Sequence, residues 1–92
     1  MGLTLRQTMA RLLEQREMSA LDLAAALLLT AREVEEHLPH LRQSLKHRLK
    51  VSPARCRACG YVFGGRRRLD APGRCPRCRQ EMVDGPWFRV LG

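Results

Sequence analysis

Apolar residues in the first half of the chain recur at the three- and four-residue spacing of amphipathic helices. One such stripe predicts a first helix that ends near residue 17; its members are Leu5, Met9, Leu12 and Leu13. A helix with a single apolar stripe buries that face and leaves the rest in solvent. The first helix is therefore expected to pack its apolar face against another element of the fold.

Two capping signals predict two further helices. Ser19, followed three positions later by Asp22, begins a second helix of about nine residues. Thr30 and Glu33 form the capping box of a third helix. Its apolar positions follow at spacings of four, three and four residues: Val34, Leu38, Leu41 and Leu45. Residues 1–50 are therefore expected to form a three-helix lobe.

Pro39 lies inside the third predicted helix. It has no N–H group to donate to the carbonyl of Glu35, and its ring crowds the preceding turn. We therefore expect the helix to be kinked at this point or broken into two pieces.

From residue 47 onward, short alternating segments replace the helical spacing. Strands are predicted over three of them: 49–51, 61–63 and 87–91. The first is expected at a sheet edge, because a proline follows it closely. Gly64-Gly65 is a two-residue turn signal, so residues 66–69 are expected to return as the second strand of a hairpin. The fold class is α+β, with a helical lobe over 1–50 and a strand-rich segment over 51–92.

Four cysteines occur as two Cys-x-x-Cys pairs with fifteen residues between them: Cys56, Cys59, Cys75 and Cys78. The two-residue gap lets the chain fold back so that both sulfurs of a pair face one ion, at bonds of about 2.3 Å. Gly60 suits a turn that needs positive φ. Arg79 occupies the equivalent place in the second pair, so the turn there must be tolerated in another way. The pattern predicts a four-thiolate metal site.

Zinc is the metal we expect, in a structural role, because four thiolates leave no open position for water or substrate. The two cysteine pairs also resemble those of rubredoxins, which hold iron and carry electrons, but rubredoxins are acidic and this segment is rich in arginine. A thioredoxin-type dithiol is disfavoured because its strand-helix-strand context is missing. An enzyme is the least favoured class, because the chain has no Ser/His/Asp set and no phosphate-cradling glycine loop.

Charge is distributed unevenly along the chain, whose formal net charge is +8. Residues 1–50 contain eight basic and six acidic side chains, a balance of +2. Residues 51–92 contain nine basic and three acidic side chains, a balance of +6. Four thiolates and a divalent ion would lower the total from +8 to +6. A chain that stays basic favours a polyanionic partner.

The N-terminal residues do not have the pattern of a secretory signal. The most apolar run, residues 20–31, contains Asp22 and is far too short to span a bilayer. We therefore expect a cytoplasmic protein with no membrane association. In that reducing compartment, paired cysteines are expected to be metal ligands rather than disulfides.

The segment from Leu21 to Thr30 resembles the second helix and turn of helix-turn-helix proteins, with alanines where two helices approach closely. That family usually has glycine at the position of Leu28. A residue other than glycine in the left-handed region costs roughly 1–2 kcal/mol. Either the turn has another shape here or packing offsets the strain.

Three segments closely resemble a family of archaeal and bacterial predicted transcriptional regulators: residues 30–38 (TAREVEEHL), 52–63 (SPARCRACGYVF) and 72–78 (PGRCPRC). That family fuses a winged helix-turn-helix to a rubredoxin-like zinc ribbon. The resemblance extends from about Leu3 to Val90. It implies a small winged helix-turn-helix lobe of three helices and short strands, a zinc ribbon, and a role as a DNA-binding transcriptional regulator.

On this interpretation, the third helix enters the major groove of double-stranded DNA with Arg32, Glu36, His37, His40 and Gln43, and an arginine hairpin grips the backbone with Arg66, Arg67 and Arg68. Glu33, Glu35 and Glu36 oppose phosphate contact at the start of that helix. Four aromatic residues could stack on bases, but we expect most of them in the core: Tyr61, Phe63, Trp87 and Phe88.

Two other functions remain open. The chain could be an adaptor whose zinc ribbon docks on a protein partner such as RNA polymerase, or a rubredoxin-like electron carrier. We expect a monomer or a homodimer, since the sequence contains no heptad pattern or dedicated dimerisation helix.

Overall fold

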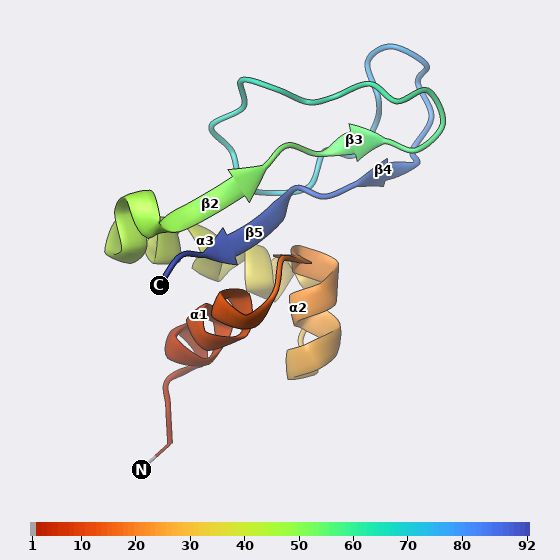
Figure 1. Ribbon diagram of the computed structural model, residues 1–92. Helices are drawn as coiled ribbons and strands as arrows, with labels where there is room; N and C mark the ends of the chain where they lie inside the picture. The colour runs from red at the N-terminus through yellow and green to blue at the C-terminus, as the bar shows by residue number, and fades with distance from the viewer. Residues whose placement is uncertain (1) are drawn as a thin grey trace.

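The computed structural model describes residues 2–92 and contains three α-helices, one 3₁₀ turn and five short strands (Figure 1). The predicted α+β class is confirmed. In chain order the elements are α1 (Leu5–Gln15), β1 (Met18–Ser19), α2 (Ala20–Leu27), α3 (Ala31–Leu45), η1 (Lys46–Arg48), β2 (Leu49–Ser52), β3 (Arg55–Cys56), β4 (Val83–Asp84) and β5 (Trp87–Val90). None of the described helices is both long and apolar enough to cross a bilayer.

Each α-helix begins with a reciprocal capping box. The Thr30 hydroxyl accepts from the Glu33 N–H at 3.1 Å, while the Glu33 carboxylate accepts from the Thr30 N–H at 3.2 Å. Ser19 caps α2 in the same way, so both predicted helix starts are confirmed. Thr4 caps α1 with the glutamine three positions later, a signal the apolar pattern alone did not include.

Helix α3 continues through Pro39 without a break, so the predicted division into two pieces is wrong. Proline removes one backbone hydrogen bond, but its exposed ring does not disturb the packing on either side. Val34 and Leu38 precede it, Leu41 follows it, and all three are buried against the core. The burial of these apolar side chains before and after Pro39 offsets the lost hydrogen bond.

Strand β5 lies in the middle of an antiparallel three-stranded sheet with the order β1-β5-β2. Phe88 is its centre and pairs with Met18 on one side and Val51 on the other. The predicted edge position of β2 is confirmed. The chain leaves this sheet after β2 and returns to it only with β5. We call the segment between them, residues 53–86, the excursion. Figure 1 shows that most of it extends away from the helices.

The excursion contains the cysteines and a second sheet of only two strands, β3 and β4. The predicted hairpin about Gly64-Gly65 is wrong. Val62 forms one isolated bridge with Arg55, and residues 66–69 form no strand. The reason is Leu69, which is only 7% exposed and belongs to the helical core. After the glycines the chain runs toward the helices instead of returning along residues 61–63.

The core lies between the helices and the inner face of the sheet. Its most buried members are Met9 and Leu13 of α1, Leu23 of α2, Leu38 of α3 and Phe88 of β5.

Of the aromatic residues in the described part of the chain, Phe88 alone lies fully in the core, so the prediction that most aromatics are buried is wrong. Tyr61, Phe63 and Trp87 are only half-buried. The rings of Tyr61 and Phe63 meet edge to face, with centroids 5.0 Å apart.

The turn between α2 and α3 has a residue other than glycine in the left-handed region. Leu28 adopts φ 57° and ψ 42°, and its side chain is 93% exposed. Packing therefore does not offset the strain. Leu28→Gly is expected to raise the free energy of unfolding by about 0.5–1 kcal/mol, since the relief of strain exceeds the added flexibility of the unfolded chain.

Urea denaturation measures this change. Ala25→Gly is the control, because the same residue placed in the exposed middle of α2 should lower stability by about 1 kcal/mol. A Leu28→Gly variant no more stable than the parent would show that the left-handed turn is not strained.

Candidate metal centre

The first cysteine pair forms a tight knuckle. The Cys56 N–H donates to the Tyr61 carbonyl at 2.8 Å, and the Gly60 N–H donates to the Cys56 carbonyl at 2.9 Å. Gly60 has a φ of +80°, so the predicted role of this glycine is confirmed. The knuckle directs both sulfurs of the pair to one side.

The second pair forms the same knuckle, with Arg79 in the place of the glycine. The Cys75 N–H donates to the Gln80 carbonyl and the Arg79 N–H to the Cys75 carbonyl, both at 2.9 Å. Arg79 takes a left-handed φ of 62° without being glycine. Its side chain is exposed, so nothing obstructs it, and the two hydrogen bonds oppose the cost of the strain.

The four sulfurs meet in one cluster. All of the Sγ atoms lie within 4.8 Å of one another, with Cys56 and Cys78 at 3.5 Å and Cys59 and Cys75 at 3.6 Å. Four ligands at about 2.3 Å from a tetrahedral ion would be about 3.8 Å apart. The donor set and the spacing therefore fit a divalent ion of the size and softness of zinc.

Repulsion among the negative charges of four neighbouring thiolates explains why this cluster needs a cation. Burial raises the pKa of the Cys75 thiol, but N–H groups of Cys78 and Arg77 and the neighbouring thiols outweigh it and bring that pKa to about 7. For Cys78, the Gln80 N–H lowers the pKa, but burial and the other three sulfurs raise it to about 12. The last proton is therefore retained until a cation replaces it.

The two sides of the cluster differ in their access to solvent. Cys56 and Cys75 are buried, Cys78 is half-buried and Cys59 is exposed. The Arg77 N–H donates to the Cys75 sulfur at 3.4 Å. When bound, zinc would cross-link the two knuckles through all four thiolates, which gives it a structural rather than a catalytic role.

Zinc affinity is expected to increase with pH, because zinc must displace protons from thiols such as Cys78, whose pKa is about 12. If at least two protons leave per ion, affinity should rise at least ~100-fold from pH 6 to pH 7. Competition against a chelator with known proton and zinc affinities measures this change. An affinity that does not change over this range would exclude thiols as the ligands.

The loop that follows the glycine turn is strapped across α3. We call residues 66–71 the strap. The Arg42 Nη1 donates to the Arg67 carbonyl at 2.6 Å, and the Ala71 N–H donates to the Glu35 carboxylate at 2.7 Å. Leu69, between these two contacts, is buried in the helical core. The metal-binding excursion is therefore fastened to the helix for which we predicted DNA contact.

Two of the three predicted phosphate-binding arginines are engaged within the strap. Arg68 donates to both carboxylate oxygens of Asp70, at 3.1 and 2.8 Å, and Arg66 reaches the same carboxylate at 3.5 Å. Arg67 forms no ion pair with any described residue. The strap keeps a balance of three basic groups to one acidic group.

The predicted residues of α3 divide between two environments. His37 is half-buried and accepts from the Arg6 Nε at 3.2 Å, so α1 covers it in part. The others are exposed on one face of the helix: Arg32, Glu36, His40 and Gln43.

The sequence predictions missed Glu35, Arg42 and Leu69 as the residues that join the strap to α3. The one available signal was Leu69, an isolated apolar residue directly after three arginines.

Comparisons with known proteins agree with this architecture. A family model described as "PF0610-like, N-terminal" matches residues 4–51, and one described as "PF0610 rubredoxin-like zinc beta-ribbon domain" matches residues 53–91. The solution NMR structure of protein PF0610 from Pyrococcus furiosus is similar, with a TM-score of 0.74 and 28% sequence identity. The alignment covers 96% of this chain and 89% of that one. No curated protein matches.

The ribbon match agrees with the four-sulfur cluster, and the N-terminal match covers the three helices and nearly all of β2. The chain belongs to the PF0610-like family, in which the N-terminal domain is followed by a rubredoxin-like zinc β-ribbon.

Proposed function

We propose that the chain is a DNA-binding transcriptional regulator in which α3 enters the major groove and the strap contacts the phosphate backbone. The order α1-β1-α2-α3-β2-β5, with β5 between β1 and β2, supports a winged helix-turn-helix arrangement. The zinc ribbon stands where a wing would connect β2 to β5. The observation that carries the proposal is the open face of α3 beside the basic strap.

That open face has groups suited to base edges. Arg32, Glu36, His40 and Gln43 are exposed and follow at spacings of four, four and three, opposite the buried side of the helix. Arginine pairs with guanine, glutamine with adenine, and a carboxylate accepts from cytosine.

The acidic start of α3 opposes this binding less than its sequence suggests. Glu33 is turned back to cap its own helix and Glu35 is turned to the strap. Only Glu36 remains on the open face. Beyond it, residues 37–69 contain nine lysines and arginines and no acidic residue.

Salt-dependent binding to duplex DNA tests the proposal. Fluorescence anisotropy of the zinc-loaded chain with a pool of random duplexes should show binding at low salt, with log K falling by about 0.9 per phosphate contact for each tenfold rise in salt. Changing Arg66, Arg67 and Arg68 together to glutamine should weaken binding and flatten that slope by up to about three.

The matched control removes the same charge elsewhere, by changing Arg74, Arg77 and Arg79 of the second knuckle to glutamine. This variant should lose less affinity than the strap variant. Equal losses would remove the strap from the interface, and no binding at low salt would contradict the regulator function itself.

A protein adaptor is the second candidate, and two exposed leucines, one in α2 and one directly after it, support it. Leu21 is 70% exposed and Leu28 is 93% exposed. Large apolar side chains at such exposure are typical of protein-binding surfaces when they lie together. Direct binding to purified RNA polymerase that is lost on Leu21→Ser and Leu28→Ser, with no binding to DNA at low salt, would favour the adaptor.

A further inference from the structure

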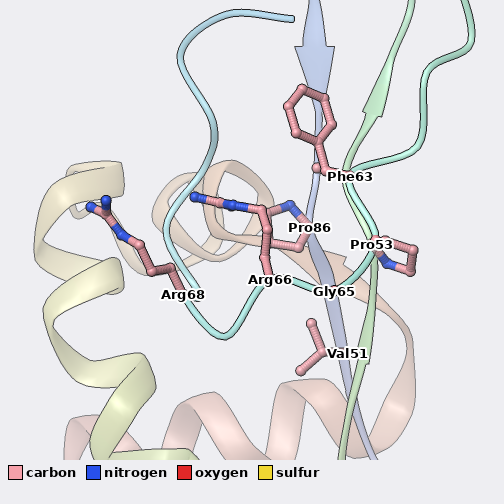
Figure 2. Close-up of a pocket in the computed structure, with 9 residues that line it drawn as sticks. Val51, Pro53, Phe63, Gly65, Arg66, Arg68 and Pro86 are labelled. Atoms are coloured by element: carbon pink, nitrogen blue, oxygen red, sulfur yellow. The ribbon is translucent and has the colours of Figure 1, made fainter. Parts of the chain in front are cut away.

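A small pocket lies where the sheet meets the zinc ribbon, between β2, the glycine turn and the start of β5 (Figure 2). Its volume is about 190 Å³. Neither the metal centre nor the open face of α3 includes it. The residues that shape it are Val51, Pro53, Phe63, Gly65, Arg66 and Pro86.

Slightly more than half of the pocket wall is apolar. Val51 is 41% exposed although it lies on the core side of β2, and Phe63 is half-buried. Figure 2 shows these two side chains at opposite ends of the pocket, with Gly65 between them. Pro53 and Pro86 add two rigid rings. The wall therefore suits a flat apolar group.

The rim of the pocket is cationic. Arg66 Nη1 donates to the Asp70 carbonyl at 2.8 Å, and its Nη2 reaches the Asp70 carboxylate at 3.5 Å. The same carboxylate accepts two shorter bonds from Arg68, which also lines the pocket. Two guanidinium groups thus share one carboxylate, and the Nε of Arg66 donates to no described residue. The rim retains a charge of +1 and spare N–H donors.

The backbone adds further donors at the same place. The backbone N–H groups of Gly64 and Gly65 donate no hydrogen bond to another described residue. A Cβ atom added to Gly64 or Gly65 would meet nothing within 4 Å, so the space beside this backbone is open. Unpaired N–H groups in a turn with positive φ, such as Gly65, suit an anion.

The volume sets the size of the occupant. A cavity of about 150 Å³ holds benzene, whereas drug-sized ligands need about 300–1,000 Å³. We propose that this pocket binds a small anion with one flat ring, whose carboxylate or phosphate meets Arg66 and the glycine turn and whose ring lies between Val51 and Phe63. The occupant is a free small molecule. This proposal does not depend on DNA binding by α3.

Three probes separate the contributions of ring and charge in the zinc-loaded chain: benzoate has both, acetate has only the charge, and benzamide has only the ring. Two-dimensional ¹H–¹⁵N NMR should show shifts at Val51, Gly64 and Gly65 with benzoate. Its dissociation constant should be in the millimolar range, as expected for about nine non-hydrogen atoms, and at least about tenfold lower than that of either other probe.

Two variants that remove the same charge locate the anion contact. Arg66→Gln should weaken benzoate binding at least about tenfold, because Arg66 lines the pocket, whereas Arg67→Gln, outside the lining, should change it less than about twofold. The proposed site would be overturned if both variants lost the same benzoate affinity. It would also be overturned if benzoate shifted the NMR signals no more than acetate does.

The same chemistry could come from a pyrimidine nucleotide within a strand. Uridine monophosphate and a short single-stranded oligothymidylate distinguish the two sources. If the occupant is a free molecule, the mononucleotide should shift the NMR signals of the same three residues as strongly as the oligonucleotide does at equal nucleotide concentration. An oligonucleotide that binds there more than about tenfold more tightly would overturn the assignment to a free molecule.

Discussion

Cys75→Ser is expected to abolish stoichiometric zinc binding and to unfold the ribbon. The Cys75 side chain is fully buried and its backbone closes the second knuckle. Metal binding is worth about 10–16 kcal/mol in small zinc domains, so loss of one of four thiolates should lower the free energy of unfolding by more than about 3 kcal/mol. Elemental analysis measures the metal, and thermal unfolding measures the stability.

Cys59 provides the matched controls, because it is the exposed cysteine of the cluster. Cys59→His supplies a nitrogen ligand and should retain zinc, whereas Cys59→Ala should lose most of it. A Cys75→Ser chain with one zinc per molecule and an unchanged Tm would contradict the four-thiolate site.

Removal of zinc is expected to release the strap from α3. Among the described residues, the ribbon forms no separate apolar cluster, since Leu69 packs into the helical core and the β3–β4 sheet has only two residue pairs. Amide hydrogen exchange at Phe63 and Ala71 should accelerate at least ~100-fold after chelation, because these amides bond to Ala54 and Glu35 only while the ribbon is folded.

Amides in the middle of α3 should change much less, since Leu38 and Leu41 remain packed against α1 and the sheet. Glu35→Gln separates the strap from the metal: exchange at Ala71 should rise while zinc is retained. Unchanged protection of Ala71 after chelation would show that the packing of Leu69 holds the strap without metal.

The sequence was sufficient to predict the elements whose causes are local. Thr30 with Glu33 and the spacing from Val34 to Leu45 define α3, and both signals lie within the helix they specify. The four-sulfur cluster was predictable for the same reason, because each Cys-x-x-Cys pair forms a local turn.

The errors came from contacts between distant segments. Gly64-Gly65 is a genuine turn signal, but burial of Leu69 among the helices decides where the chain goes next. Pro39 would break an isolated helix, yet packing on both sides keeps α3 continuous. In each case tertiary structure outweighs a local preference of about 1–3 kcal/mol.

The junction of strap and helix was beyond sequence reasoning. Arg42 and Glu35 resemble any solvated charges on an exposed helix face, and nothing local indicates that they bind the Arg67 carbonyl and the Ala71 amide. These contacts nevertheless connect the metal centre to α3. They make the zinc ribbon part of the surface that we propose for DNA.

The four cysteines form one closed zinc site that holds the ribbon together, and metal analysis combined with thiol counting tests this site. We expect about one zinc and no iron per chain, almost no reactive thiol before chelation and all four cysteines reactive afterwards. Bound iron with visible absorption, or thiols that react freely while zinc is bound, would contradict it.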